Sequence, residues 1–409
     1  MAEVTITRLG HLGDGVADGP VFAPRTLPGE VVAGEVVAGR IAAPRILTPA
    51  RERISPPCAH YRACGGCALQ HAREAFVTSW KEDVIRQALA AHGLAAHFRP
   101  AHVSPLHSRR RANFAGRRLK KGALVGFHGR GSDTLTEITG CLILHPDLRA
   151  ALPALEDLTQ LAASRKATLT LALTRSEAGL DLQVQGAKPL DAGLRVALGH
   201  WAAQAGVARL ACGDEVIAQA TPPWHQIGPA RVTPPPGAFL QATKPAELAL
   251  QAAVTEAVGG VARVADLFAG CGTFALPLAQ QAEVLAVEGV REMLLALDAG
   301  WRSAPGLRPV RHAARDLFRA PLDPAELAGF GAVVIDPPRA GAEAQARALA
   351  RSAVPRIAAV SCNPVSFARD AALLAAGGYR LDWVQLIDQF RFSPHAELAA
   401  QFTKAHIAA

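Results

Sequence analysis

One cysteine of this chain stands where a nucleophile is useful, Cys362 in Val360-Ser-Cys-Asn-Pro364. The apolar run before it, residues 357–360, predicts a buried strand, and the proline stops that strand just after the cysteine. In open parallel sheets the carboxyl ends of strands face the ligand crevice, where a thiolate can attack a substrate. A free cysteine more often serves as a small buried hydrophobic residue, so the neighbouring motifs must show whether Cys362 is a nucleophile.

Two carboxylates accompany this cysteine in the C-terminal part of the sequence. Asp336 ends an apolar run in Ala332-Val-Val-Ile-Asp-Pro-Pro-Arg339, and Glu397 follows the last predicted strand in His395-Ala-Glu397. Such groups can move protons. Amino-group methylases usually place a base-stacking aromatic after the two prolines, and Arg339 stands there instead, which argues against N-methylation.

A cluster of thiols predicts a metal centre near the N-terminal third. Three cysteines fall within ten residues, and two glycines between them allow a tight turn that brings them together. Soft thiolates select zinc or iron–sulfur clusters. The candidate ligands are Cys58, Cys64, Cys67 and, downstream, Cys141. The alternative is zinc, held by the first three thiols with His60, His71 or Cys141.

A nucleotide-type cofactor is predicted from Asp266-Leu-Phe-Ala-Gly270-Cys-Gly-Thr273, a strand that runs into a glycine turn and a helix. Glycines let the backbone approach a ligand, so Phe268, Gly270 and Thr273 are candidate cofactor contacts. Glu288, after the next strand, is placed for ribose hydroxyls, and Asp316 for an adenine amine. The pattern differs from the dinucleotide fingerprint and fits S-adenosylmethionine (SAM) better than NAD; a plain nucleotide-binding domain is the alternative.

The elements that must position these residues fall into three regions. Residues 1–48 alternate β-like runs with glycine turns and fit a small barrel. Residues 49–235 hold the thiols and then mix β-like runs with Ala-rich helix. From residue 236 to residue 409, strand–helix alternation implies a parallel sheet.

Basic residues indicate a polyanionic partner. The formal net charge is +8 and the isoelectric point is near 9.4. The segment 107–121 is especially basic, and Phe114 within it could stack on bases of RNA. The alternative is a solvated pair of charged strands.

The cysteine count and the N-terminus indicate the compartment. An odd number of cysteines, seven, argues against structural disulfides. Residues 1–10 lack the pattern of a signal peptide, and no apolar run is long enough to span a membrane. We therefore expect a cytoplasmic protein of 409 residues without a membrane partner.

Together these motifs resemble the RNA uracil-C5 methyltransferases, which form 5-methyluridine in tRNA and ribosomal RNA. The resemblance implies an α/β fold: a C-terminal Rossmann-like class I SAM methyltransferase domain, an N-terminal TRAM (OB-like) β-barrel and a central α+β RNA-binding subdomain. It implies a [4Fe–4S] cluster on Cys58, Cys64, Cys67 and Cys141. It adds Gln241, in Phe239-Leu-Gln241, as a SAM contact, and we expect a monomer.

The resemblance also implies a mechanism. Cys362 would attack C6 of a flipped-out uracil, C5 would take the methyl group of SAM, and Glu397 would remove the C5 proton. Asp336 and Gln241 would hold SAM and orient the base. The RNA would be 23S rRNA or tRNA.

Three positions depart from the family pattern, and two other functions stay open. Thr243 stands where an Asn is usual, residues 298–306 contain no Asn, and residues 388–391 are Asp-Gln-Phe-Arg rather than Asp-Met-Phe-Pro. These departures concern cofactor affinity and substrate choice more than the reaction. The alternatives are an RNA-binding iron–sulfur protein with an inactive methylase domain, and an RNA cytosine-C5 methyltransferase.

Overall fold

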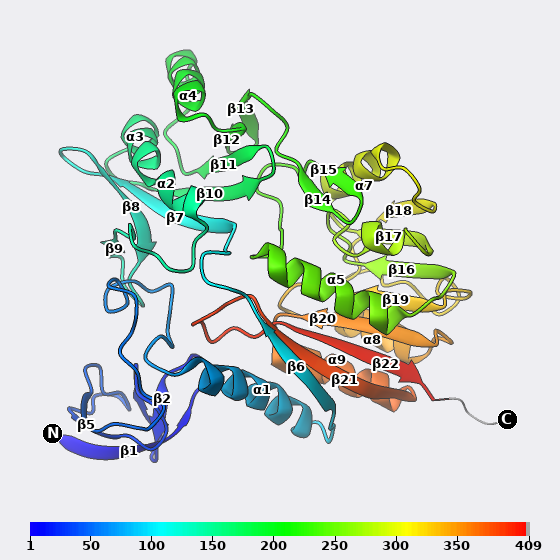
Figure 1. Ribbon diagram of the computed structural model, residues 1–409, viewed down its shortest axis with the longest axis horizontal. Helices are drawn as coiled ribbons and strands as arrows, with labels where there is room; N and C mark the ends of the chain where they lie inside the picture. Colours follow the sequence, from blue (N-terminus) through cyan, green and yellow to red (C-terminus); the bar gives the residue numbers. More distant parts are fainter. Residues whose placement is uncertain (406–409) are drawn as a thin grey trace.

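The computed structural model describes residues 1–405 and arranges them around three larger sheets and a two-stranded ribbon (Figure 1). The N-terminal sheet is antiparallel, in the order β3-β2-β1-β4-β5. Its strands are β1 (Ala2–Leu9), β2 (Gly15–Ala17), β3 (Val21–Ala23), β4 (Val31–Gly34) and β5 (Arg45–Thr48). Backbone hydrogen bonds join Phe22 to Gly39 and Ile41, which bends the sheet toward closure. Its identity as a TRAM barrel stays a prediction.

The central sheet has seven strands in the order β13-β12-β11-β10-β7-β8-β9. These are β7 (Arg111–Arg118), β8 (Ala123–His128), β9 (Leu135–Thr136), β10 (Thr168–Ser176), β11 (Gly179–Gln185), β12 (Arg209–Cys212) and β13 (Glu215–Gln219). The accompanying helices are α2 (Pro146–Ala150), α3 (Leu152–Ala162) and α4 (Ala192–Ala205). The ribbon of β14 (His225–Ile227) and β15 (Ala230–Val232) follows. Buried side chains alternate along β7 and β10, as expected for strands with one face on a core.

The C-terminal sheet has eight strands in the order β18-β17-β16-β19-β20-β22-β21-β6. They are β6 (His97–Val103), β16 (Arg263–Leu267), β17 (Glu283–Glu288), β18 (Val310–Ala314), β19 (Ala332–Ile335), β20 (Arg356–Ser361), β21 (Tyr379–Asp388) and β22 (Leu398–Lys404). Only β22 runs antiparallel to its neighbours. The parallel sheet predicted from strand–helix alternation is confirmed.

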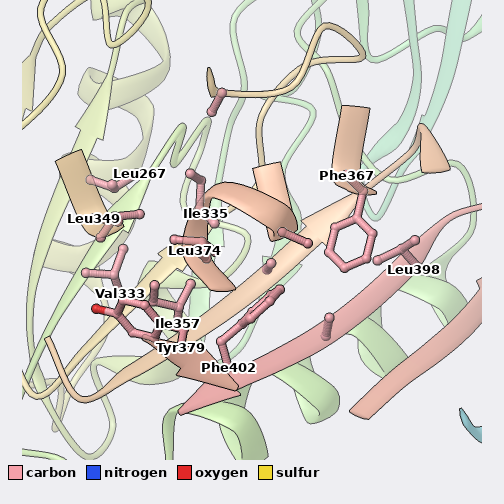
Figure 2. Close-up of a cluster of buried hydrophobic side chains, with 14 of the residues drawn as sticks. Leu267, Val333, Ile335, Leu349, Ile357, Phe367, Leu374, Tyr379, Leu398 and Phe402 are labelled. Atoms are coloured by element: carbon pink, nitrogen blue, oxygen red, sulfur yellow. The ribbon is translucent and has the colours of Figure 1, made fainter. Parts of the chain in front are cut away.

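Helices cover both faces of this sheet, so its central strands are mostly apolar, with Asp266 of β16 as a buried exception. One face carries α1 (Glu74–Ala90), α8 (Glu343–Ala350) and α9 (Pro364–Ala376). The other carries α5 (Lys244–Val258), α6 (Ala275–Leu278) and α7 (Arg291–Ser303). Figure 2 shows the first face, where Phe367 and Leu374 of α9 lie near Phe402 of β22. This rigid layer fixes the ends of β19, β20 and β22, where the chemical groups lie.

Two elements from the region predicted as central belong to the C-terminal sheet. β6 pairs in parallel with β21, and α1 packs against α9. The C-terminal sheet therefore contains a strand that lies before the predicted domain boundary at residues 235 and 236. Among residues 1–405, we find no helix with the length and apolar character needed to cross a membrane.

Candidate active site

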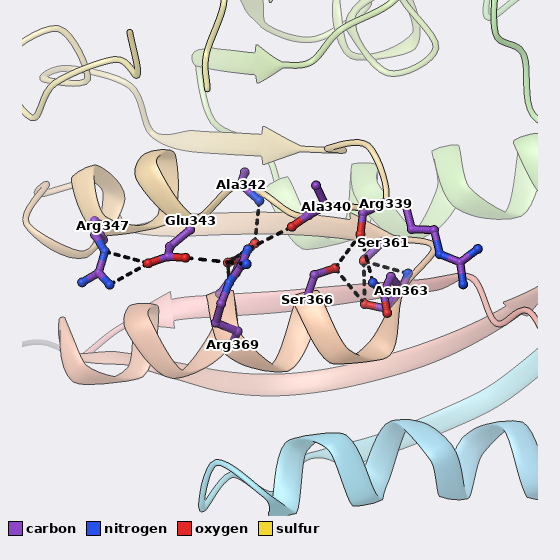
Figure 3. A network of polar contacts seen from close by, with 10 residues as sticks. Arg339, Ala340, Ala342, Glu343, Arg347, Ser361, Asn363, Ser366 and Arg369 are labelled. Carbon is purple, nitrogen blue, oxygen red and sulfur yellow. Dashed lines mark hydrogen bonds and ion pairs between the residues drawn. The ribbon is translucent and has the colours of Figure 1, made fainter. Parts of the chain in front are cut away.

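Cys362 follows β20 directly and precedes α9, where its thiol stays half-buried. Asn363 ends the strand and caps the helix, since its Oδ1 accepts a hydrogen bond from the Val365 N–H at 3.1 Å. Its Nδ2 donates to the Arg339 carbonyl at 2.9 Å, and Ser366 Oγ donates to the same carbonyl at 3.1 Å (Figure 3). These bonds tie the loop after Asp336 to the loop that carries Cys362.

The strand register brings Glu397 beside Cys362. Ser361 of β20 pairs with Leu398 of β22, so the next residues along the two antiparallel segments are Cys362 and Glu397. The Glu397 side chain is 4% exposed. The sequence could not predict this pairing, because β22 enters the sheet between β20 and β21 rather than after β21.

Burial raises the pKa of each acid in this group, and repulsion between them contributes. Desolvation raises the pKa of Glu397 to about 8, with the charge of Asp336 as a further cause. Desolvation also raises the pKa of Asp336 to about 7, although its side chain keeps partial exposure. The pKa of the Cys362 thiol is raised to about 11, first by desolvation and then by the charges of Glu397 and Asp336. Nearby positive charge is needed to ionise the thiol near neutral pH.

Gln389, which was not among the predicted site residues, connects the side chains of Gln241 and Glu397. Its Nε2 donates to Gln241 Oε1 at 2.6 Å and to Glu397 Oε2 at 3.1 Å. Its Oε1 accepts from the Ala242 N–H at 2.7 Å. Gln389, Gln241 and Glu397 are all buried. In the sequence, Gln389 could have been noticed because the family pattern has Met at this position.

The predicted cofactor residues lie around the carboxyl ends of neighbouring strands. Glu288, the last residue of β17, accepts the Gly270 N–H on Oε2 at 3.0 Å. Phe268, just after β16, has a φ of 62°, a strained value for a residue with a side chain. Its ring lies 5.4 Å from that of Phe318, whose N–H donates to Asp316 Oδ1 at 2.9 Å. Strain of this kind concentrates at ligand sites.

Two further residues complete this edge. Thr273 lies in the turn before α6, and its carbonyl accepts from Gln251 Nε2 at 3.0 Å. Asp266, absent from the predicted set, is fully buried in β16, and burial with the nearby charges of Asp336 and Glu288 raises its pKa. Within residues 1–405, no protein cation pairs with Asp266, Asp336 or Glu288. This arrangement fits a ligand that carries positive charge, as the sulfonium and amino groups of SAM do.

The four predicted thiol ligands line one cavity of about 330 Å³ between the central and C-terminal sheets. Desolvation raises the pKa of Cys67 to about 12 and that of Cys64 in the same direction, and the other thiols of the group contribute. Within the described residues, no three His, Cys, Asp or Glu side chains converge closely enough to hold a metal ion. Soft thiolates of this kind suit either an iron–sulfur cluster or a zinc ion.

The basic segment is less exposed than its composition predicted. Arg110 is 4% exposed and forms an ion pair with Glu247 of α5. Phe114 is 1% exposed and stacks on Phe127 at 5.3 Å between ring centroids, so its interpretation as a base-stacking residue is wrong. Phe114 is buried because alternate residues of β7 face the core, and Arg110, just before β7, is held by Glu247. Arg111, by contrast, lies over the ring of Phe239, which is 58% exposed.

Known proteins resemble this chain along nearly its whole length. Residues 313–405 match the family model described as tRNA (Uracil-5-)-methyltransferase. The chain is 43% identical over 405 residues to an uncharacterized RNA methyltransferase of Brucella suis, and the match covers 98% of each chain. It is 30% identical over 426 residues to the 23S rRNA (uracil(1939)-C(5))-methyltransferase RlmD of Shewanella piezotolerans, covering 98% of this chain and 95% of that one.

A solved structure shares the fold. The Pyrococcus abyssi tRNA (uracil-54, C5)-methyltransferase, in complex with S-adenosyl-L-homocysteine, superimposes with a TM-score of 0.76 at 20% identity. The match covers 98% of this chain and 99% of that chain. The α/β architecture with Rossmann-like elements is therefore common to both.

Proposed function

Because this chain belongs to the family of SAM-dependent RNA (uracil-C5)-methyltransferases, we propose that it forms 5-methyluridine through a covalent bond between Cys362 and the base. The observation that carries the mechanism is the pairing of the Cys362 thiol with the buried Glu397 carboxylate across β20 and β22. A thiol and a carboxylate side by side can add to a base and then remove a proton from it.

In the first step, the Cys362 thiolate forms a bond from Sγ to C6 of uracil. The electrons of the C5–C6 double bond move toward C5 and the C4 carbonyl, which gives an enolate. C5 then takes the methyl group from SAM, whose sulfonium supplies an electrophilic methyl and leaves as a neutral thioether. The bond to Sγ is needed because uracil C5 is otherwise too weak a nucleophile.

In the second step, Glu397 takes the C5 proton. The electrons of that C–H bond restore the C5–C6 double bond and expel the Cys362 thiolate. A pKa of about 8 suits a base that works near neutral pH, because the carboxyl group can both take and release the proton there. Gln389 holds this carboxylate in place from one side.

Several residues are positioned to hold SAM. Asp336 and Asp266 place negative charge where a cationic ligand would bind, and Glu288 and Asp316 lie at the ends of the adjoining strands. Phe268, Gly270 and Thr273 form the turn between β16 and α6. We assign Gln241 to the substrate base and the cofactor together, because its amide reaches the same hydrogen-bonded group as Glu397.

We propose a [4Fe–4S] cluster on Cys58, Cys64, Cys67 and Cys141. The support is the shared cavity that all four thiols line. The cluster would join the segment 58–67 to the central sheet and has no part in methyl transfer, because no thiol would be left for substrate. Zinc is the second candidate for this site.

The substrate we propose is 23S rRNA or tRNA, bound by residues 1–48 as a TRAM barrel and by exposed basic and aromatic side chains of residues 49–235. One candidate is Arg111, which is half-buried and lies over the exposed ring of Phe239 just beyond that range. We propose a monomeric enzyme that acts on RNA in the cytoplasm.

The test is methylation of defined RNA. Unmodified transcripts of 23S rRNA and of tRNAs are incubated with the anaerobically purified protein and SAM, and the products are digested and mapped by mass spectrometry. Formation of 5-methyluridine at one or a few sites supports the proposal. 5-Methylcytidine instead would support the cytosine-specific alternative, and no product from either RNA would favour an inactive methylase domain.

A further inference from the structure

The orientation of the Gln241 amide can be derived from one backbone group. The Ala242 N–H can only donate, and it donates to Gln389 at 2.7 Å, so the atom of Gln389 at that end must be the oxygen. The other end of the Gln389 amide is then its NH₂ group, which can only donate. Its neighbour on Gln241, at 2.6 Å, must therefore be the Gln241 oxygen.

The assignment leaves the Gln241 NH₂ group available. The Gln241 oxygen is engaged by Gln389, and its Nε2 donates to no group within residues 1–405. Gln241 is 2% exposed as a residue, and its Nε2 is not fully enclosed, so this donor is open to a ligand in the site. Because Gln389 also donates to Glu397, the free donor and the proposed base belong to one rigid hydrogen-bonded unit.

We propose that Gln389 is a positioning residue, which fixes the Gln241 amide so that it offers donors to the substrate base and selects a keto group over an amino group. The inference rests on the proposed function and adds a basis for choosing uracil. Uracil has a carbonyl next to the methylated carbon, whereas cytosine has an amino group there, and an amino group cannot accept. A Gln241 free to rotate could instead offer its oxygen and accept from cytosine.

Two variants test this role. Gln389→Met keeps the length of the side chain but cannot donate. Gln389→Glu keeps its shape and can accept from Ala242, but its carboxylate cannot donate to Gln241 and Glu397. Either variant should lower kcat/KM for uridine about tenfold, the effect of roughly one lost hydrogen bond. The preference for uridine over cytidine should fall as well, measured on transcripts that carry either base at the position methylated by the wild type.

The pH profile separates positioning from general damage. Hydrogen bonding from Gln389 lowers the pKa of Glu397, opposing desolvation, so its loss should move the rising limb of the rate to higher pH by up to about one unit. The control is Gln385→Met in β21, the strand that ends just before Gln389, which loses only a hydrogen bond to the Pro100 carbonyl. It should keep the wild-type rate, profile and base preference.

The outcomes are distinguishable. If the wild type makes no 5-methyluridine, the proposed function fails before the variants are compared. If the wild type is active and the folded variants keep both its base preference and its pH profile, Gln389 does not position Gln241. A fall in rate with both other readouts unchanged would show a structural role only and would also overturn the inference.

Discussion

Lys81 of α1 reaches Asp388 at the end of β21, with 2.7 Å between Nζ and Oδ1. Both side chains are almost completely buried, at 0% and 3% exposure. The Lys81 ammonium also donates to the Phe390 carbonyl at 3.1 Å. An N-terminal helix thus fixes the loop that carries Gln389 and leads to Glu397.

Lys81→Met should destabilise the protein by about 3–5 kcal/mol, because it leaves the Asp388 carboxylate buried without its ion-pair partner. Adding Asp388→Asn should recover part of that loss, since the stranded charge is removed. Urea unfolding of the single and double variants measures both effects. Lys120→Met, at an exposed hairpin, is the control and should change stability by less than about 0.5 kcal/mol. Equal stability of Lys81→Met and wild type would show that the pair is dispensable.

Two neighbouring arginines should behave differently. Arg110→Met removes one of the two cationic partners of Glu247, which keeps Lys244 at 2.6 Å, and should cost about 1.5–3 kcal/mol of stability. Arg111→Met should leave stability nearly unchanged, weaken RNA binding, and reduce the slope of log K against log salt by about 0.7, one phosphate contact on a single strand. Filter binding across salt concentrations and urea unfolding check the pair. An unchanged salt slope in Arg111→Met would make this residue a solvated surface group.

Glu397 should make the free protein less stable as pH rises. Its pKa is raised from 4.5 to about 8 in the folded state, so between these values the folded state holds a proton that the unfolded state has lost. The contribution is present below pH 4.5 and is lost as pH rises toward 8. Glu397→Gln should gain stability over the wild type with rising pH, by at most about 1.4 kcal/mol per unit in this window. A constant difference in urea unfolding between pH 5 and pH 8 would contradict the shifted pKa.

The metal centre makes a prediction about composition. Anaerobically purified protein should contain about four iron and four sulfide per chain and absorb visible light broadly. Cys58→Ser, Cys64→Ser, Cys67→Ser or Cys141→Ser should lose the iron and lower the soluble yield. Cys212→Ser, in the core of the central sheet, should keep the iron. One zinc per chain and no iron would replace the cluster with the zinc alternative.

The sequence predicted those parts of the site that follow local patterns. Cys362, Asp336 and Glu288 each follow an apolar run, and a parallel sheet brings the carboxyl ends of such runs to one edge. Pairings between distant segments could not be predicted. The register that sets Glu397 beside Cys362 depends on where β22 enters the sheet, and no local pattern encodes that position.

Which residues of the basic segment are buried could not be predicted from the sequence either. The composition of residues 107–121 indicates RNA binding as a whole, but which face of β7 turns inward depends on the packing of α3 against it. Phe114 and Arg110 are buried in the protein interior, whereas Arg111 is not fully buried. In the same way, the change at position 389 was visible, but its contacts with Gln241 and Glu397 required the fold.

The covalent mechanism is tested most directly by electrophoresis of protein with RNA under denaturing conditions. Glu397→Gln removes the base but leaves the thiol, so addition and methyl transfer proceed while elimination stalls. This variant should accumulate a methylated protein–RNA adduct that requires SAM, with turnover reduced about 10²–10⁴-fold. Cys362→Ala, alone or combined with Glu397→Gln, should give neither adduct nor 5-methyluridine. Methylation by Cys362→Ala at the wild-type rate would contradict the covalent mechanism, and normal turnover in Glu397→Gln would assign the proton to another group.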